Sequence, residues 1–528
     1  MSPEPWSRGT QKGEHPMTEA ELLLAQVWKD VLGAQDVRPD DDFYSLGGDS
    51  LLALKVVTEA EARGLPLTLV QLFRNPTLRG ACAGLSPAGA SSAAEQPLGD
   101  LPQEWNLLGP EDRENLPADA ESAVPATRLQ LGMIYESLVS RGTVYVDSVA
   151  RDIQLPLDTA LLEQALETMA QRHPGLRTRF DLTGFDVPVA VVSRAAVLRL
   201  SPSLTDLGQP FDPESGPLIR VHAAGLPDRD SAFRLSYAFH HAIMDGWSES
   251  VFVSELVRLY AGLLRGEEVS LPRPARYEEY VRLEREAAAD PRARDFFVTR
   301  YDGTAAARHS AEAVHDKRSM PVPHAIAQRW EELARHWGVP MKSLAVAVHC
   351  AAVAEVWQVP APVVGLSVNG RPETEGGDLT IGLFLNHLPL RLELAGLSWQ
   401  EAARGALAAE HELLPYRRFP YAQIREAVGG DPFEVALSYV HFHLRDDLLA
   451  SGLVGVEEDM YDHTSLPVRV ELINDPRGLG LGFDVTADTA RYGEGFAQRL
   501  GEALLRAAER LATQPDSPAL PLATAAID

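Results

Sequence analysis

The chain has 528 residues, of which 45% are hydrophobic and 23% are charged. This balance is typical of folded proteins, and at about 100 to 200 residues per domain the length predicts several structural units. The 75 acidic and 48 basic residues give a formal net charge of −27, which disfavours nucleic acid and anionic membranes as partners.

Residues 1–16 are polar and lack the apolar segment of a secretory signal peptide. The two cysteines, Cys82 and Cys350, are far apart in alanine-rich surroundings, so they predict neither a disulfide framework nor a thiolate metal site. The most apolar helical segment, residues 344–357, contains His349 and Glu355, which indicates a buried helix and not a membrane span. We therefore expect a cytoplasmic protein without a membrane partner.

A small helical unit is predicted at residues 17–86. Thr18 and Glu21 have the spacing of a capping box, apolar residues then recur at helical intervals, and Gly33 supplies a C-terminal stop. A loop and a second helical pattern follow. We expect a small all-α bundle with a modest core.

The second helical pattern of this unit begins at Ser50, directly after the sequence Leu-Gly-Gly-Asp. Two glycines before a helix form a tight turn that exposes the hydroxyl, and the helix N-terminus offers N–H groups and partial positive charge to an attached phosphate. On these residues alone, an ordinary serine N-cap is the simpler interpretation.

Residues 87–121 are rich in Pro, Gly, Ala and acidic residues and show little periodicity, which predicts a linker. The remainder of the chain mixes helical and alternating patterns, so it predicts an α/β unit. We expect strands at residues 233–239 and 363–368, and helices at residues 158–172, 325–337, 344–357 and 496–511.

The strand at residues 233–239 runs into the segment His240-His241-Ala-Ile-Met-Asp245-Gly246-Trp-Ser. Adjacent side chains on a strand point to opposite faces, so the two histidines are poorly placed to bind one metal ion. A turn at Gly246 lets Asp245 return beside His241, which suits an acid/base or charge-positioning histidine. Two core histidines and a turn aspartate give the same spacing, so the residues alone leave both interpretations open.

Residues 41–51, DDFYSLGGDSL, and the helix with Trp28 before them resemble the peptidyl carrier domains of nonribosomal peptide synthetases. The resemblance covers the whole small unit and implies a four-helix carrier bundle without a metal. It implies that a phosphopantetheinyl transferase attaches 4′-phosphopantetheine to Ser50, and that the thiol of this arm carries an aminoacyl or peptidyl thioester. Asp49 is a departure, because this family often has His there before a condensation step and Asp before an epimerisation domain.

The His-His-x-x-x-Asp-Gly motif resembles the signature of condensation domains, which are related to chloramphenicol acetyltransferase-like acyltransferases. Further segments match in the expected order, at residues 125–133, 172–180, 277–280, 370–372, 381–391 and 416–423. The resemblance covers nearly all of residues 124–511. It implies two acyltransferase-like lobes in a V, which we place at residues 122–297 and 298–520, with the histidines at the centre of a tunnel open at both ends.

The resemblance also implies the reaction, in which the amine of an acceptor aminoacyl thioester attacks a donor thioester and a peptide bond forms. His241, beside His240, is at the residue credited with catalysis, as a general base or as a group that orients the amine and stabilises the tetrahedral intermediate. Asp245 carries over as a structural residue.

An arginine is expected to form a salt bridge with Asp245, and Arg371 is the first candidate and Arg177 the second. Gly246 is expected to allow close approach of its backbone to the reacting centre. Two positions depart from the family pattern: His387 replaces the usual Thr, and Ser438 stands where Asn is frequent. We expect both to influence selectivity more than the type of reaction.

Two alternatives accompany this hypothesis. A carrier–epimerisation didomain shares the histidine motif, but the Gly-Trp-Ser sequence after Asp245 resembles condensation domains more closely. A non-catalytic recruitment platform typically loses the motif, which is intact here. The chain shows no adenylation-like segment, so we expect an upstream adenylation domain and a downstream acceptor carrier in the same assembly line.

Overall fold

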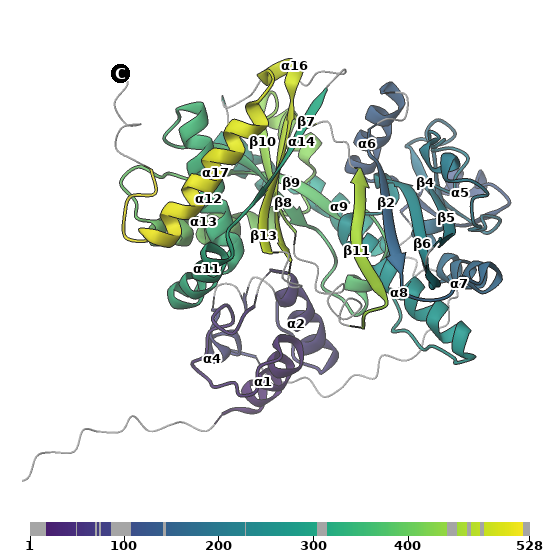
Figure 1. Cartoon of the computed structure of the whole chain (residues 1–528), viewed down its shortest axis with the longest axis horizontal. Helices are drawn as coiled ribbons and strands as arrows, with labels where there is room; N and C mark the ends of the chain where they lie inside the picture. Colours follow the sequence, from purple (N-terminus) through teal and green to yellow (C-terminus); the bar gives the residue numbers. More distant parts are fainter. Residues whose placement is uncertain are drawn as a thin grey trace, which may run out of the picture. The chain divides into compact units, whose positions relative to one another are not determined.

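The computed structural model describes residues 17–48, 50–68, 71–72, 75–85, 107–140, 144–227, 229–301, 303, 314–440, 451–461, 466–475 and 480–520. The chain divides into two units, Met1–Ala94 and Glu95–Asp528. Figure 1 shows the elements of both.

The described part of the first unit contains the helices α1 (Glu19–Leu32), α2 (Ser50–Ala62) and α4 (Leu78–Ala81). The predicted capping box is confirmed, because Thr18 accepts a hydrogen bond from the backbone of Glu21 and the Glu21 side chain accepts one from Thr18 N. The predicted stop at Gly33 is confirmed by its left-handed φ of 68°. The unit is held together by a core in which the Trp28 and Phe43 rings are fully buried, with centroids 5.5 Å apart.

The N-terminal half of the second unit contains a four-stranded and a three-stranded sheet, with strand orders β11-β2-β6-β5 and β1-β4-β3. Their strands are β1 (Ala120–Pro125), β2 (Val146–Ile153), β3 (Thr178–Asp181), β4 (Val189–Ser193), β5 (Ile219–Leu226), β6 (Arg229–His240) and β11 (Val454–Tyr461). The accompanying helices are α5 (Pro110–Glu114), α6 (Arg128–Val139), α7 (Thr159–Arg172), α8 (Gly246–Arg265) and α9 (Tyr277–Ala289). The next helix, α10 (Pro291–Tyr301), packs into the hydrophobic core of the C-terminal half. The predicted strand at residues 233–239 and helix at residues 158–172 are therefore confirmed.

The C-terminal half forms a six-stranded mixed sheet of order β7-β13-β12-β10-β8-β9. Its strands are β7 (His315–Pro321), β8 (Val363–Asn369), β9 (Leu385–Arg391), β10 (Val435–Val440), β12 (Val468–Asp475) and β13 (Gly480–Asp488). One face is covered by α11 (His324–Trp337), α12 (Met341–Trp357), α13 (Trp399–Leu413) and α17 (Phe496–Thr513), as Figure 1 shows. The short helices α14 (Tyr421–Val428) and α16 (Thr489–Tyr492) complete this half.

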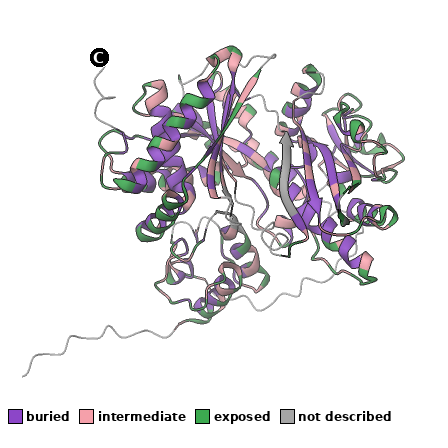
Figure 2. Cartoon of the chain, viewed as in Figure 1, coloured by how far each residue is buried: buried purple, intermediate pink, exposed green. Residues whose placement is uncertain are grey.

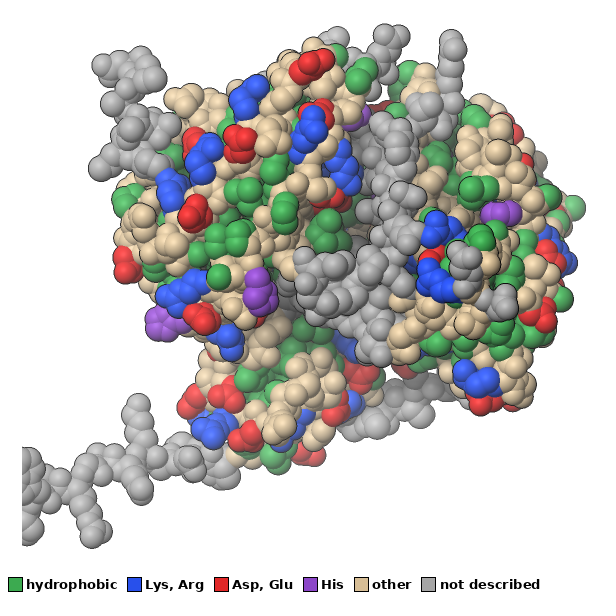
Figure 3. Space-filling view, viewed as in Figure 1, with side chains coloured by type: hydrophobic (Ala, Val, Ile, Leu, Met, Phe, Trp, Pro, Cys, Tyr) green, Lys and Arg blue, Asp and Glu red, His purple; other side chains and the backbone are tan. Residues whose placement is uncertain are grey.

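The predicted helices at residues 325–337, 344–357 and 496–511 are confirmed as α11, α12 and α17, and the predicted strand at residues 363–368 is confirmed as β8. Helix α12 is buried on nearly all sides, which agrees with its apolar sequence (Figure 2). Figure 3 shows basic and acidic side chains interspersed on the surface of the C-terminal half. One ion pair there joins Arg506 to Glu355 at 2.6 Å.

Strand β11 connects the two halves of the second unit. It belongs to the C-terminal half in sequence, but it pairs antiparallel with β2 and becomes the edge of the four-stranded sheet. The proposed lobe boundary at residue 297 therefore does not separate the two halves completely, because β11 follows this boundary in sequence but pairs in the sheet that precedes it.

None of the described helices is by itself long and apolar enough to cross a membrane, and the sharply bent pair α11 and α12 meets those criteria only jointly.

Candidate active site

The turn before α2 is shaped by two glycines and an aromatic ring. The side chain of Asp42 accepts hydrogen bonds from Tyr44 N and Ser45 N, both at 3.0 Å, and Gly48 N donates to the carbonyl of Phe43 at 2.9 Å. Gly47 has a φ of 93°, which favours glycine, and a Cβ on Gly48 would overlap the Phe43 ring. These contacts hold the backbone up to Gly48, and α2 begins at Ser50.

The two histidines occupy different environments at the end of β6. His240 is 2% exposed, and its Nδ1 accepts a hydrogen bond from Ala242 N at 3.1 Å. Burial, assisted by the nearby charge of His241, lowers the pKa of His240 to about 4. His240 is therefore a neutral, structural imidazole at neutral pH.

His241 begins a short 3₁₀ turn, and its backbone N–H donates to the carbonyl of Tyr145 at 2.8 Å. Its ring lies edge-on to the rings of Tyr145 and Phe239, with centroids 6.5 Å away in each case. Its Nε2 lies 3.9 Å from Oδ2 of Asp147, and its side chain retains an exposed fraction of 14%. His241 is thus the less enclosed histidine of the pair and has a carboxylate beside it.

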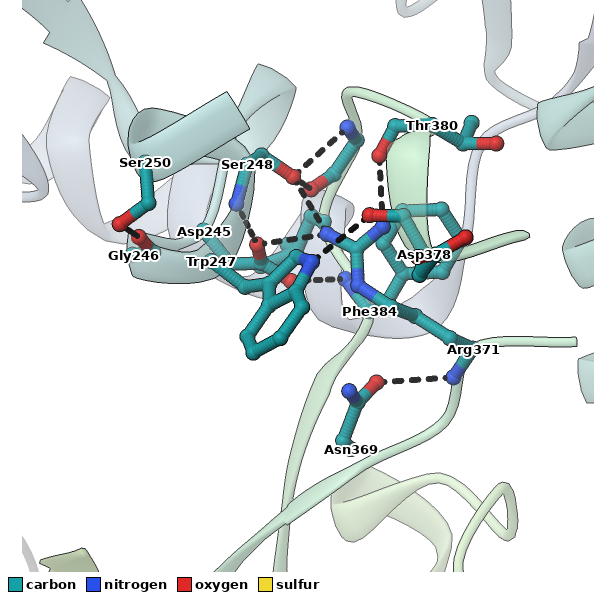
Figure 4. Close-up of polar contacts among 12 residues, drawn as sticks. Asp245, Gly246, Trp247, Ser248, Ser250, Asn369, Arg371, Asp378, Thr380 and Phe384 are labelled. Atoms are coloured by element: carbon teal, nitrogen blue, oxygen red, sulfur yellow. Dashed lines mark hydrogen bonds and ion pairs between the residues drawn. The ribbon is translucent and has the colours of Figure 1, made fainter. Parts of the chain in front are cut away.

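Asp245 caps the N-terminus of α8 and forms an ion pair with Arg371 (Figure 4). Its Oδ1 accepts from Ser248 N at 2.8 Å and from Nη2 of Arg371 at 3.0 Å, and its Oδ2 accepts from Phe384 N at 3.1 Å. These contacts use both carboxylate oxygens. They correct the expectation that Asp245 returns beside His241, because the carboxylate recorded beside His241 is that of Asp147.

Arg371 is 1% exposed and joins several segments around Asp245 (Figure 4). Its Nη1 donates to the carbonyls of Gly377 at 3.1 Å and Thr380 at 2.6 Å, and its Nη2 also donates to Oγ of Ser248 at 2.6 Å. Its guanidinium lies over the Phe384 ring, 4.0 Å from the centroid. Burial lowers the pKa of Arg371, and the Asp245 carboxylate opposes that effect.

Arg177, the second candidate partner of Asp245, is engaged elsewhere. Its Nη1 pairs with Oε2 of Glu121 at 2.8 Å, and its Nε donates to the carbonyl of Ala170 at 2.7 Å. The structure therefore pairs Asp245 with Arg371 and not with Arg177. Gly246 is the exposed first residue of α8, directly after the cap.

His387 and Ser438, the two departures from the family pattern, lie close together. The hydroxyl of Ser367 contacts both, at 3.2 Å from Nδ1 of His387 and 2.7 Å from Oγ of Ser438. Burial is the main cause that lowers the pKa of His387 to about 4, and the charge of His241 contributes. The cluster therefore lies within electrostatic range of His241.

Asp147 and Tyr145 are the residues around His241 that the sequence analysis missed. Tyr145 has a φ of 61°, which is unusual for a residue other than glycine, and it precedes β2. Asp147 lies on the buried face of β2 together with Val149 and Arg151. A charged residue on the inward side of an alternating strand was the signal that could have identified Asp147.

Within the described ranges, no group of three or more His, Cys, Asp and Glu side chains is arranged to hold a metal ion.

Comparisons with known proteins identify two families. Residues 120–524 match the family described as Condensation domain, and residues 23–85 match the family described as Phosphopantetheine attachment site. The AMB antimetabolite synthetase AmbE of Pseudomonas aeruginosa is 31% identical over 93% of this chain and 24% of its own length. Malpibaldin synthetase of Mortierella alpina is 25% identical over 90% of this chain and 9% of its own length. The chain thus spans less than a quarter of either relative.

Solved structures show the same fold for the second unit. The first condensation domain of the CDA synthetase aligns with a TM-score of 0.63 and 20% identity, over 76% of this chain and 98% of that one. The X-domain in its complex with OxyB from teicoplanin biosynthesis aligns with a TM-score of 0.61 and 19% identity, over 78% and 99%. Together with the family matches, these findings show that the chain belongs to the condensation-domain family of nonribosomal peptide synthetases and carries a phosphopantetheine-binding carrier domain ahead of the condensation domain.

Proposed function

We propose that the condensation domain forms a peptide bond between a donor acyl thioester and the amine of an acceptor aminoacyl thioester. The observation that carries this proposal is the environment of His241, a partly accessible imidazole at the end of β6. The turn that follows it is fixed by the buried pair of Asp245 and Arg371. This arrangement keeps a partly accessible acid/base group at a defined position.

In the proposed reaction His241 accepts a hydrogen bond from the attacking amine. The nitrogen forms a bond to the donor carbonyl carbon while His241 takes the proton that the nitrogen loses. The carbon–sulfur bond breaks, and the departing sulfur receives this proton, so that His241 returns to its neutral form. A positioned general base of this kind contributes about 10²–10⁴-fold to a rate.

The other motif residues have supporting roles in this proposal. His240 is neutral and fixes the end of β6 through its hydrogen bond with Ala242 N. Asp245 and Arg371 hold the turn that carries His241. Gly246, at the exposed start of α8, leaves the backbone open to the substrate.

The carrier family binds 4′-phosphopantetheine covalently, and we assign the attachment to Ser50. The residues present fit the group, because Ser50 is the first residue of a 13-residue helix and the glycine turn ahead of it packs against Phe43. The N–H groups of that helix end favour a phosphate. When bound, the arm supplies the thiol that carries an acyl group as a thioester.

We further propose how the domains of the chain are arranged and which partners they have. Residues 17–86 form a four-helix carrier bundle, residues 87–121 form the linker, and residues 122–297 and 298–520 form two lobes in a V, apart from the exchange of β11. The partners are an upstream adenylation domain, a downstream acceptor carrier and a phosphopantetheinyl transferase. A cytoplasmic location remains a prediction from the sequence.

A turnover assay with soluble substrates tests the proposed function. The whole chain is mixed with an acyl-pantetheine donor and an aminoacyl-pantetheine acceptor, and the amide product is quantified by mass spectrometry. We expect product from the wild type and about 10²-fold less from His241→Ala. His336→Ala, which changes an exposed histidine of α11, is the matched control and should retain the wild-type rate. Equal rates for the wild type and His241→Ala would contradict the proposal.

A further inference from the structure

The Asp147 carboxylate lies beside His241 without touching it. The separation between Oδ2 of Asp147 and Nε2 of His241 is 3.9 Å, and the two side chains have exposed fractions of 11% and 14%. Both groups are therefore largely enclosed but still accessible to a small polar group. The motif that carries His241 does not include Asp147.

The sheet explains why the two side chains meet. Asp147 of β2 lies directly opposite Phe239 of β6, and His241 follows Phe239 by two residues. Opposed residues on antiparallel strands share a face, and so do alternate residues on one strand. His240 lies opposite Val146 and belongs to the other face. The hydrogen bond from His241 N to the carbonyl of Tyr145, at 2.8 Å, fixes the two chain segments at this point.

The distance itself indicates how the pair is used. A separation of 3.9 Å is too long for a direct hydrogen bond, whose donor and acceptor are about 2.7–3.2 Å apart. If one nitrogen lies about 2.8 Å from both atoms, the angle Oδ2–N–Nε2 at that nitrogen is about 90°. Two N–H bonds of an amine can point to the two acceptors at this angle. An amine can therefore donate one N–H to Asp147 and another to Nε2 of His241 at the same time.

We propose that Asp147 binds the α-amino group of the acceptor and holds it against Nε2 of His241. This inference rests on the proposed function, since it assigns the acceptor amine to the site of His241. The chemical class recognised is a primary ammonium or amine. Asp147 accepts a charge-assisted hydrogen bond from it. The form that attacks is the neutral amine, which donates one N–H to Asp147 and the other to His241. His241 takes the proton that the nitrogen loses on bonding to the donor carbonyl carbon, and the departing sulfur then receives it.

A second role for Asp147 leads to a different expectation. If Asp147 only orients or supports His241, its effect on ligand binding does not depend on whether the ligand carries an amine. If it binds the amine, its effect disappears for a ligand that lacks one. A pair of stable ligands that differ only in this group separates the two roles.

The test measures the binding of glycyl-aminopantetheine and acetyl-aminopantetheine, in which an amide replaces the reactive thioester. Dissociation constants are measured by calorimetry at about pH 6.5, where an α-amino group of pKa about 7.7–8.0 is protonated. The proteins are the wild-type chain, Asp147→Asn and Asp152→Asn. Asp152 is the matched control because it is a buried carboxylate of the same strand, paired with Arg229 and Arg234.

We expect the wild type to bind the glycyl ligand about 10- to 100-fold more tightly than the acetyl ligand. Asp147→Asn should lose that difference and bind the acetyl ligand as the wild type does, which also shows that the variant is folded. Asp152→Asn should retain the difference. Equal binding of both ligands by the wild type, or an equal loss for both ligands in Asp147→Asn, would overturn the inference.

The binding measurements do not depend on whether the chain forms product, so they test Asp147 separately from the proposed function. Wild-type chain that forms the amide product but shows no preference for the glycyl ligand would refute the role of Asp147 and leave the proposed function intact. Amine-dependent binding that requires Asp147, in a chain that forms no product, would refute the proposed function and not the amine site.

Discussion

Asp245 and Arg371, which are 126 residues apart in sequence, form a buried ion pair at 3.0 Å that ties the start of α8 to the segment between β8 and β9. The same guanidinium reaches the carbonyls of Gly377 and Thr380. Its hydrogen bonds therefore link several chain segments next to the turn that carries His241.

Removing one partner of this pair should destabilise the second unit strongly. Asp245→Asn leaves the buried guanidinium without its counter-charge, and we expect its free energy of unfolding to fall by about 3–5 kcal/mol. Urea unfolding followed by circular dichroism measures the change. The control is Glu267→Gln, which breaks the exposed pair with Arg265 and should cost less than about 1 kcal/mol. Similar losses in both variants would show that the buried pair is unimportant.

The turn before Ser50 should be sensitive to a single methyl group. A Cβ in Gly48→Ala overlaps the Phe43 ring, and we expect a loss of about 1–3 kcal/mol together with slower phosphopantetheine transfer to Ser50. Intact-mass spectrometry follows the transfer. Gly33→Ala is the control, because it costs about 1 kcal/mol through its left-handed backbone but has open space around it. Its transfer rate should stay normal, and a normal rate in Gly48→Ala would refute the prediction.

Buried histidines should make the second unit sensitive to acid. Burial is the main cause that lowers the pKa of His240 and His387 to about 4 and of His349 to about 3, whereas an unfolded histidine has a pKa of about 6.5. The unfolded chain therefore binds more protons below about pH 6.5, and stability is lost as the pH falls from there toward the folded pKa values. Above about pH 6.5 this contribution is fully present.

His349 allows a direct test of this acid sensitivity. It is fully buried in α12, and among the described residues neither ring nitrogen has a hydrogen-bond partner. We expect His349→Leu to lose less stability than the wild type between about pH 7.5 and about pH 5, measured by urea unfolding. His336→Gln, an exposed change on α11, should behave like the wild type. An unchanged acid dependence in His349→Leu would contradict the account.

His387 and Ser438 should act together, because Ser367 contacts both. We expect His387→Thr and Ser438→Asn to change the relative rates for different acceptor side chains. The change in the free energy of unfolding in the double variant should differ from the sum of the two single changes by about 0.5–3 kcal/mol, as is found for residues of one hydrogen-bonded network. A double-mutant cycle measures the deviation. If the changes in unfolding free energy add and the acceptors keep the same order of rates, the two positions act independently and do not influence selectivity.

Much of the fold follows from local sequence patterns. The capping box of Thr18 and Glu21, the alternation that ends at His240 and the apolar length of α12 each have a local physical cause, and each prediction is confirmed. Strand β11 could not be anticipated, because its pairing with β2 joins residues about 300 positions apart and no local pattern encodes that partner.

The candidate site, too, could be predicted from sequence only where its residues are neighbours in the chain. The His240 and His241 motif is visible in sequence because its members are neighbours on one strand and turn. The spacing alone leaves open whether Asp245 serves His241, and the family resemblance favours the pairing with Arg371 that the structure has. Neither predicts that Asp147 lies beside His241 from another strand. Which carboxylate faces which base is decided by sheet register, and register is not readable from the motif.

The most direct test of the central claim is intact-mass spectrometry of the whole chain in deuterated buffer, with a peptidyl-pantetheine loaded on Ser50 and an aminoacyl-pantetheine acceptor added. We predict loss of the peptide from the chain and appearance of the elongated acceptor, and neither event in His241→Ala. Deuterium gained at the α-carbon without transfer would indicate epimerisation and contradict the claim. A wild-type chain that keeps its peptide unchanged, in the presence of acceptors that differ in side chain, would contradict it as well.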